Sequence, residues 1–131
     1  MSHIVEARTN IKNPDRALLR QVVEIVAGQH AGGRLQDFYV TYEGARRKSA
    51  LAISTSVVRR GMGISVKRDT GELAFTGDPF GCRNEFQEIQ QQIVQTYVSL
   101  ATMQALQALG YQVESEDGEA GQVVLTGVTY A

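Results

Sequence analysis

The sequence predicts an α+β fold: an antiparallel sheet of about five to seven strands with two helices packed on one face. Three observations predict it. Two segments carry apolar residues at helical spacing, several short segments alternate apolar and polar residues, and glycine- or proline-containing turns separate them. The expected order is strand, helix, three or four strands, helix and two strands. The length of 131 residues and the 43% hydrophobic content fit one domain over residues 1–131.

The first third of the chain predicts a strand followed by a helix. Residues 3–11 alternate in polarity and stop at Asn13-Pro14, where Asn13 can cap a helix and Pro14 suits its first turn. Apolar residues then recur at three-to-four spacing over 18–26, and Gly28 is a natural stop. A helix with one apolar stripe is therefore expected between them.

The middle of the chain predicts four strands. Over 35–43, every second residue is apolar, and the residues between them form a face that is expected to be polar and exposed. Tyr39 lies on this exposed face. Over 49–58, the second face holds only small side chains, which permit close packing. Residues 61–67 and 72–77 flank a turn that ends in glycine, so they are expected to form a hairpin.

The last third predicts the longest element. Asn84 is a good cap, and residues 85–109 contain neither glycine nor proline. A helix of roughly 25 residues spans about 38 Å, which is longer than a small sheet is wide, so one end is expected to project or to pack on another subunit. Residues 111–116 and 122–130 flank Asp117-Gly118 and predict a closing hairpin. This order of elements is related to ferredoxin-like folds.

Charge is divided unevenly along the chain. All thirteen Lys and Arg residues lie at or before Arg83, and the last 48 residues hold six acidic residues and no basic one. Seven of the cations fall within residues 46–68, a segment without any acid. The net charge of −1 argues against nucleic-acid binding over the whole surface and leaves a local patch as the candidate.

The sharpest candidate site is a basic patch with an aromatic neighbour. If strands 49–58 and 62–68 pair as a hairpin, the cations of the 46–48 and 67–68 turns meet at one end, where they could contact phosphates, and Tyr39 could stack on a base. The patch consists of Arg46, Arg47, Lys48, Lys67, Arg68 and Tyr39. Two alternatives stay open: solvated turn residues, or partners for the acidic closing hairpin in the same molecule or the next.

No set of residues converges on catalysis. Cys82 precedes the long helix beside Arg83, where the helix dipole and the charge would both stabilise a thiolate, but neither His3 nor His30 is adjacent to it in sequence. The alternative is an incidental small residue. Cysteine and histidine spacing suggests no metal site, and we expect no cofactor. The single cysteine and the absence of a long apolar run predict a cytoplasmic protein without a membrane partner.

Several short motifs match a known family in order and spacing. They are Met1-Ser2-His3-Ile4 with Arg8-Thr9 and Ile11, then Gly63-Ile64, Gly71-Glu72-Leu73-Ala74, Phe86, Ile93, Gln95, Tyr97 and Leu109-Gly110-Tyr111-Gln112-Val113. With these motifs the chain resembles the chloroplast and cyanobacterial open-reading-frame-thirty-five family, although the match is looser over 28–60. The resemblance implies a small compact domain of unknown function without established catalytic residues. It also implies a protein partner, an ATPase of the AAA type.

These observations favour a non-enzymatic interaction or adaptor protein that self-associates through the long helix or binds a protein partner. The alternative is a protein that binds nucleic acid or another polyanion through the basic patch. An enzyme acting on a small anionic substrate through Cys82 or His3 is the remote alternative.

Overall fold

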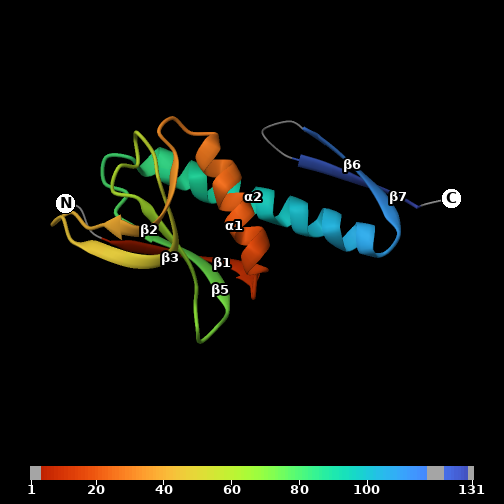
Figure 1. The fold of residues 1–131 in the computed structure, drawn as a ribbon, viewed down its shortest axis with the longest axis horizontal. Helices are drawn as coiled ribbons and strands as arrows, with labels where there is room; N and C mark the ends of the chain where they lie inside the picture. Colours follow the sequence, from red (N-terminus) through yellow and green to blue (C-terminus); the bar gives the residue numbers. More distant parts are fainter. Residues whose placement is uncertain (1–3, 118–122, 130–131) are drawn as a thin grey trace.

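The computed structural model describes residues 4–117 and 123–129 and confirms the α+β class. Five antiparallel strands form the main sheet, in the order β1-β5-β4-β3-β2, and a separate two-stranded sheet holds β6 and β7 (Figure 1). The elements are β1 Val5–Lys12, α1 Arg16–Gly28, β2 Arg34–Val40, β3 Arg46–Ser54, β4 Met62–Val66, β5 Glu72–Gly77, α2 Arg83–Ala108, β6 Tyr111–Asp117 and β7 Val123–Thr129.

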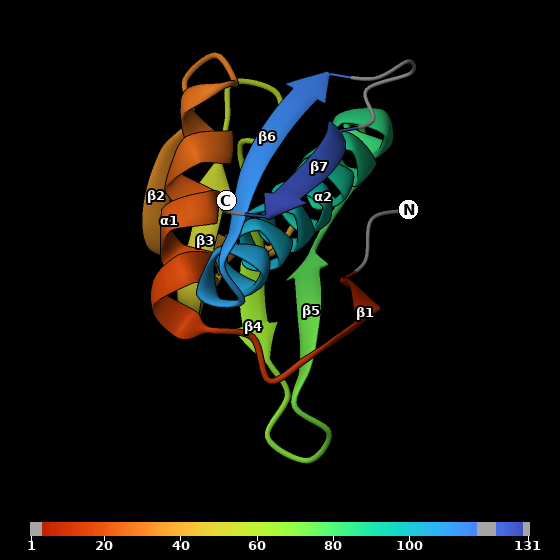
Figure 2. The same cartoon turned by 90° about the vertical axis from the view of Figure 1, so that its right-hand side faces the viewer.

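The chain order explains the position of the helices. Strands β2 to β5 are consecutive antiparallel neighbours, while β1 pairs with β5 at the opposite edge, from Val5↔Gly77 to Arg8↔Ala74. The chain must therefore cross the sheet between β1 and β2, and α1 makes this crossing. Figure 2 shows α1 and α2 on the same face of the main sheet.

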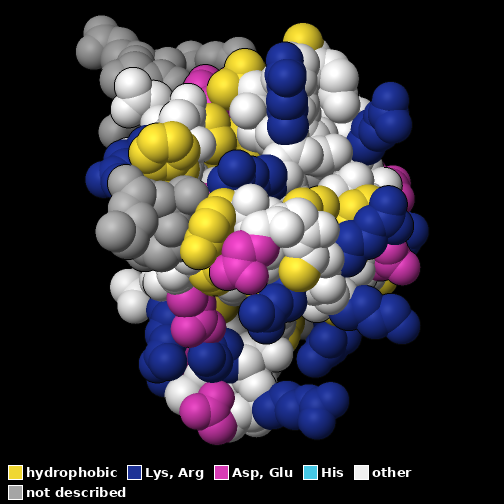
Figure 3. All heavy atoms as spheres, turned by 90° about the vertical axis from the view of Figure 1, so that its left-hand side faces the viewer, with side chains coloured by type: hydrophobic (Ala, Val, Ile, Leu, Met, Phe, Trp, Pro, Cys, Tyr) yellow, Lys and Arg dark blue, Asp and Glu magenta, His cyan; other side chains and the backbone are white. Residues whose placement is uncertain are grey.

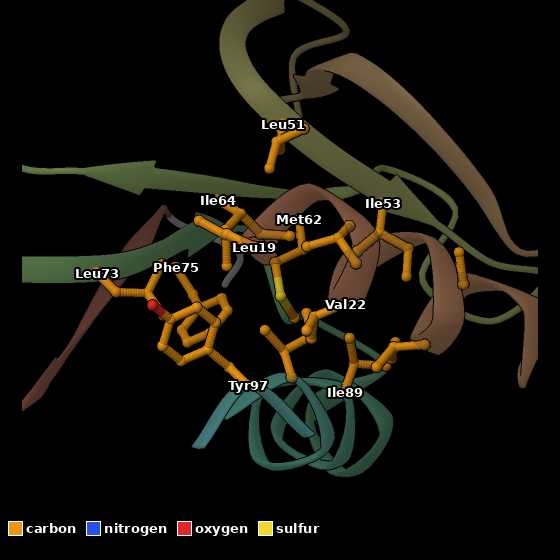
Figure 4. Packing of buried hydrophobic residues seen from close by; sticks show 14 of the residues in the cluster. Leu19, Val22, Leu51, Ile53, Met62, Ile64, Leu73, Phe75, Ile89 and Tyr97 are labelled. Atoms are coloured by element: carbon orange, nitrogen blue, oxygen red, sulfur yellow. The ribbon is translucent and has the colours of Figure 1, made fainter. Parts of the chain in front are cut away.

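The core lies between the helices and that face. Apolar side chains from both helices meet those of the three central strands, and each fully buried aliphatic side chain contributes about 1.5–3 kcal/mol of transfer free energy. Figure 4 shows this packing, with Leu19, Val22, Ile53, Met62, Ile64, Leu73, Phe75, Ile89 and Tyr97 pointing toward one another. Tyr97 also fixes α2 to the start of α1, because its hydroxyl accepts a hydrogen bond of 2.8 Å from the Asp15 N–H.

Both predicted helix caps are wrong. Asn13 does not cap α1: it has a positive φ of 49°, and its N–H donates to the Gly71 carbonyl in the β4–β5 turn at 2.8 Å. Asp15 caps the helix, and its carboxylate accepts from the Leu18 N–H at 3.0 Å. At α2 the N-cap residue is Cys82, which makes no side-chain capping bond, in place of the expected Asn84.

The two predicted strands of the segment 35–58 end earlier than expected. β2 stops at Val40, and beyond it Thr41 is buried while Tyr42 is exposed, the reverse of the predicted alternation. β3 covers Arg46–Ser54, so it begins within the segment 46–48 that was predicted as a turn, and it is followed by a loop over residues 55–61. The loop forms because the Thr55 hydroxyl accepts hydrogen bonds from two following backbone N–H groups. The hairpin of β4 and β5 is as predicted.

The β2–β3 hairpin bends part-way along its length, and its outer part no longer pairs with β4. Between the pairs Gln36↔Ala52 and Phe38↔Lys48, a single residue of β2 lies opposite three residues of β3, so the register shifts. Pairing of β3 with β4 stops at Leu51↔Ile64. The outer part of the hairpin crosses toward the β3–β4 loop, where the Val40 N–H donates to the Arg60 carbonyl at 2.7 Å.

The long helix extends beyond the sheet, as its length predicts. Its 26 residues correspond to about 39 Å. The last fully packed residue is Tyr97, and no side chain of residues 98–108 is buried. The β6–β7 hairpin packs along this second half of α2 (Figure 1). We call residues 98–110 together with β6 and β7 the arm.

Candidate functional site

The predicted basic patch is not assembled by strand pairing. Strands β3 and β4 pair as the expected antiparallel hairpin, but the pairing stops at Leu51↔Ile64, so it does not extend to residues 46–48 and the 67–68 turn and does not bring them together. Figure 3 shows Lys and Arg side chains spread over this side of the molecule with acidic side chains among them. Arg46 lies 4.3 Å from the centroid of the Phe38 ring, and Lys67 binds Glu6 at 2.8 Å. The pair lowers the pKa of Glu6, chiefly through the hydrogen bond from Lys67.

A row of three hollows nevertheless links parts of the two groups. One hollow is lined by Asp37, Lys48, Ser49 and Ala50. The second, of about 320 Å³, shares Ala50 with the first. The third contains Lys67 and Arg68 and shares Arg16 and Val66 with the second. Lys48, Lys67 and Arg68 therefore lie along one surface, to which α1 adds two cations.

We call the second hollow the α1 groove, because the first turns of α1 form one wall and the diverging strands β3 and β4 form the other. It is lined by Arg16, Ala17, Leu19, Arg20, Ala50, Leu51, Ile64, Ser65 and Val66. Sequence reasoning missed Arg16 and Arg20. Their i, i+4 spacing on one helix was visible, but nothing in the sequence placed them near Lys67.

Tyr39 is not the exposed stacking platform that the sequence predicted. The side chain is half-buried, and its ring lies against Gly63 on the sheet face away from the helices. A Cβ atom built on Gly63 would lie 2.8 Å from Tyr39 Cδ1. The absence of a side chain at Gly63 therefore leaves room for the Tyr39 ring. The small residues noted over 49–58 lie on another strand, and their role in close packing stays a prediction.

A second polar cluster lies at the start of α2 and was not predicted. His30, in the turn after α1, places Nδ1 3.1 Å from Glu85 Oε1 and Nε2 2.7 Å from Gln92 Oε1. Thr55 donates to the same Glu85 oxygen at 3.4 Å. The three elements are thus tied together around an imidazole whose side chain is only 9% exposed. No sequence pattern indicated that these distant residues would meet.

Next to this cluster, Arg60 is held by a buried acid. Arg60 Nη1 lies 2.6 Å from Asp78 Oδ2, and the Asp78 side chain is fully buried. The other Asp78 oxygen accepts from the Phe80 N–H at 3.0 Å. This cation therefore anchors the loop after β3 to the loop after β5 and does not extend the basic surface.

The environment of Cys82 contradicts the expected thiolate. Burial raises the pKa of the Cys82 thiol, and the carboxylates of Asp78 and Glu85 raise it further, while Arg60 opposes them weakly. The thiol is therefore kept protonated at neutral pH. His3, the other residue considered for chemistry, lies outside the described residues.

Among the described side chains, those of residues 4–113, no group of three or more His, Cys, Asp and Glu residues could hold a metal ion. The side chains of Glu114, Glu116 and Asp117 and the whole of Glu119 lie outside the described part of the chain, so the predicted pairing of the acidic hairpin with the cations stays a prediction. None of the described helices is apolar over a length sufficient to cross a membrane. Comparison with known proteins finds no matching family model, curated protein or solved structure.

Proposed function

We propose that this chain is a non-enzymatic interaction protein that self-associates through the arm. The observation that carries the proposal is the position of the second half of α2, which extends beyond the sheet and carries a hairpin whose main contacts are with α2 itself (Figure 1). An isolated two-stranded hairpin is marginally stable in water. A hairpin supported by one helix gains stability if a second copy covers its free face.

Exposed apolar side chains support this location. Val98 is 47% exposed where α2 leaves the core, and Leu109 is 75% exposed where it ends. The sequence of β7 is also rich in aliphatic residues, namely Val123, Val124, Leu125 and Val128, whose side chains lie outside the described part of the chain. Apolar residues on a surface that projects from the body are typical of protein contacts. The body of the protein then stays free to bind another partner, and the family resemblance suggests an ATPase of the AAA type for that role.

Light scattering on the full chain tests self-association. We expect a mass above that of the 14.3 kDa monomer at tens of micromolar protein. Leu109→Lys should shift the mass toward the monomer, because a lysine at the end of a helix is compatible with its dipole but not with an apolar contact. Phe80→Lys is the matched control, since Phe80 is 61% exposed but lies at the other end of α2. A monomeric wild-type chain at all concentrations contradicts the proposal.

A second candidate function is polyanion binding by the surface that carries Lys48, Lys67 and Arg68. It is favoured by the row of hollows that joins these residues, and weakened by the covered Tyr39 and by the Lys67–Glu6 pair. Oligonucleotide binding that falls steeply between 50 and 200 mM salt supports it. No binding at low salt removes it.

A further inference from the structure

We propose that the α1 groove binds an extended acidic peptide segment of a protein partner, with an apolar side chain of the peptide in the hollow and its carboxylates on Arg16 and Arg20. The inference rests on the proposed interaction function but uses a surface separate from the arm. It also differs from the predicted basic patch, because its walls are formed by α1 and by the gap between β3 and β4.

The floor of the groove is aliphatic. The buried Leu19 of α1, Leu51 of β3 and Ile64 of β4 form it, Val66 and the exposed Ala50 line the rim, and the hollow has a volume of about 320 Å³. Leu51 and Ile64 form the last pair of the β3–β4 ladder, so the hollow begins where the two strands separate. A site of this kind accepts an apolar side chain and removes it from water.

The separation of the strands also leaves backbone groups beside the groove. Val66 pairs with Leu73 of β5, but it lies beyond the last residue of β4 that pairs with β3. Ile64 directs its carbonyl toward β3, where it accepts from the Ser49 hydroxyl at 3.3 Å. The backbone N–H and C=O groups of successive strand residues point to alternate sides. Those of Val66, two residues after Ile64, therefore point to the same side as the Ile64 carbonyl, which beyond Ile64 is the gap left by β3. These groups are where an extended peptide could form strand-like hydrogen bonds.

The charge around the groove selects an acidic peptide. Arg16 makes no ion pair with any described residue, and Arg20 makes only an exposed 3.5 Å contact with Glu24. The neighbouring hollow is lined by two further cations, Lys67 and Arg68, and by one acid, Asp69. Two arginines at i, i+4 on one helix can bind two carboxylates of an extended chain, because the guanidinium group is a bidentate donor.

The same features argue against nucleic acid as the occupant. Binding of single-stranded nucleic acid uses aromatic side chains as stacking platforms, and none lines the groove. An aliphatic floor next to a strand edge favours a peptide strand whose face toward α1 carries one apolar side chain with acidic side chains two positions before and after it.

Fluorescence anisotropy tests the proposal on the full-length protein, with a labelled octapeptide that carries a central leucine, glutamates two positions before and after it, and serine elsewhere. We expect saturable binding that a glutamine-for-glutamate peptide does not reproduce. The double variant Arg16→Gln with Arg20→Gln should weaken binding about tenfold, the combined effect of two partly exposed ion pairs. Arg34→Gln is the matched control, because Arg34 is also exposed but lines none of the three hollows.

A second variant separates shape from charge. Ala50→Phe should fill the hollow from its exposed rim and weaken binding while every cation stays in place. Circular dichroism verifies that each variant folds. Unchanged affinity in both the arginine and the Ala50 variants overturns the proposal, as does a thymidine oligonucleotide that binds the same groove more tightly than the peptide. Leu109→Lys should leave peptide affinity unchanged, so a failed groove and a failed arm give different results.

Discussion

Replacing Gly63 with alanine tests the bent hairpin, which forms the gap at the α1 groove. Gly63 lies in β4 with its missing side chain directed at the Tyr39 ring. An added Cβ would lie 2.8 Å from Cδ1 and 3.0 Å from Cε1 of that ring, and 3.1 Å from the Ser49 hydroxyl. These distances are shorter than ordinary van der Waals contact.

The expected loss follows from two opposing effects. Overpacking of this kind destabilises by about 1–3 kcal/mol. Alanine in a strand recovers about 0.5–1 kcal/mol, because glycine loses more backbone entropy on folding. The free energy of unfolding of Gly63→Ala should therefore fall by about 1–2 kcal/mol, measured by urea unfolding. Gly28→Ala is the control, since no atom lies within 4 Å of its added Cβ, and it should be neutral or slightly stabilising.

Combination with Tyr39→Ala separates this clash from a general strand effect. If the ring is the obstacle, Gly63→Ala should lose most of its penalty in the Tyr39→Ala background, giving a coupling free energy of about 1–2 kcal/mol. Equal penalties in both backgrounds, or a Gly63→Ala variant more stable than the wild type, would refute the placement of Tyr39 across the sheet.

Three further results are expected. Gly33→Ala should destabilise by about 3 kcal/mol or more in urea unfolding, because its Cβ would lie 1.8 Å from the Ala27 carbonyl oxygen, which the helix holds in place; a loss below 1 kcal/mol contradicts this. Arg60→Met should lower the free energy of unfolding by about 2 kcal/mol by leaving the buried Asp78 carboxylate without its cation, and an unchanged value argues against the pair. Iodoacetamide should alkylate Cys82 more slowly than free cysteine at pH 8, with a rate that rises as the pH approaches its raised pKa; rapid alkylation at pH 7 would show a thiolate.

The helices and the β4–β5 hairpin were predictable because local chemistry determines them. Apolar spacing defined α1, the absence of glycine and proline defined α2, and Gly71 adopts a positive φ of 74° in the expected turn. Helix starts were less predictable. Asn13 and Asp15 are both good caps, and the choice depends on the bond from Asn13 to the distant Gly71.

The candidate site was less predictable than the fold. The bent hairpin brings Tyr39 against Gly63, and these residues are far apart in sequence, so continuous strand pairing was the natural assumption. Continuous pairing of β3 with β4 would have placed Lys48 beside Lys67, and it gave no reason to add Arg16 of α1 to the same basic surface. The His30–Glu85 contact likewise joins residues 55 positions apart.

Hydrogen–deuterium exchange at two protein concentrations tests the proposed self-association through the arm most directly. If a second copy covers the arm, amides of residues 98–108 and of β6 should exchange more slowly at high concentration, while amides of β4 and β5 in the main sheet should exchange at the same rate. Identical exchange of the arm at both concentrations, with association confirmed by light scattering, would contradict the account, because the contact would then lie elsewhere on the protein.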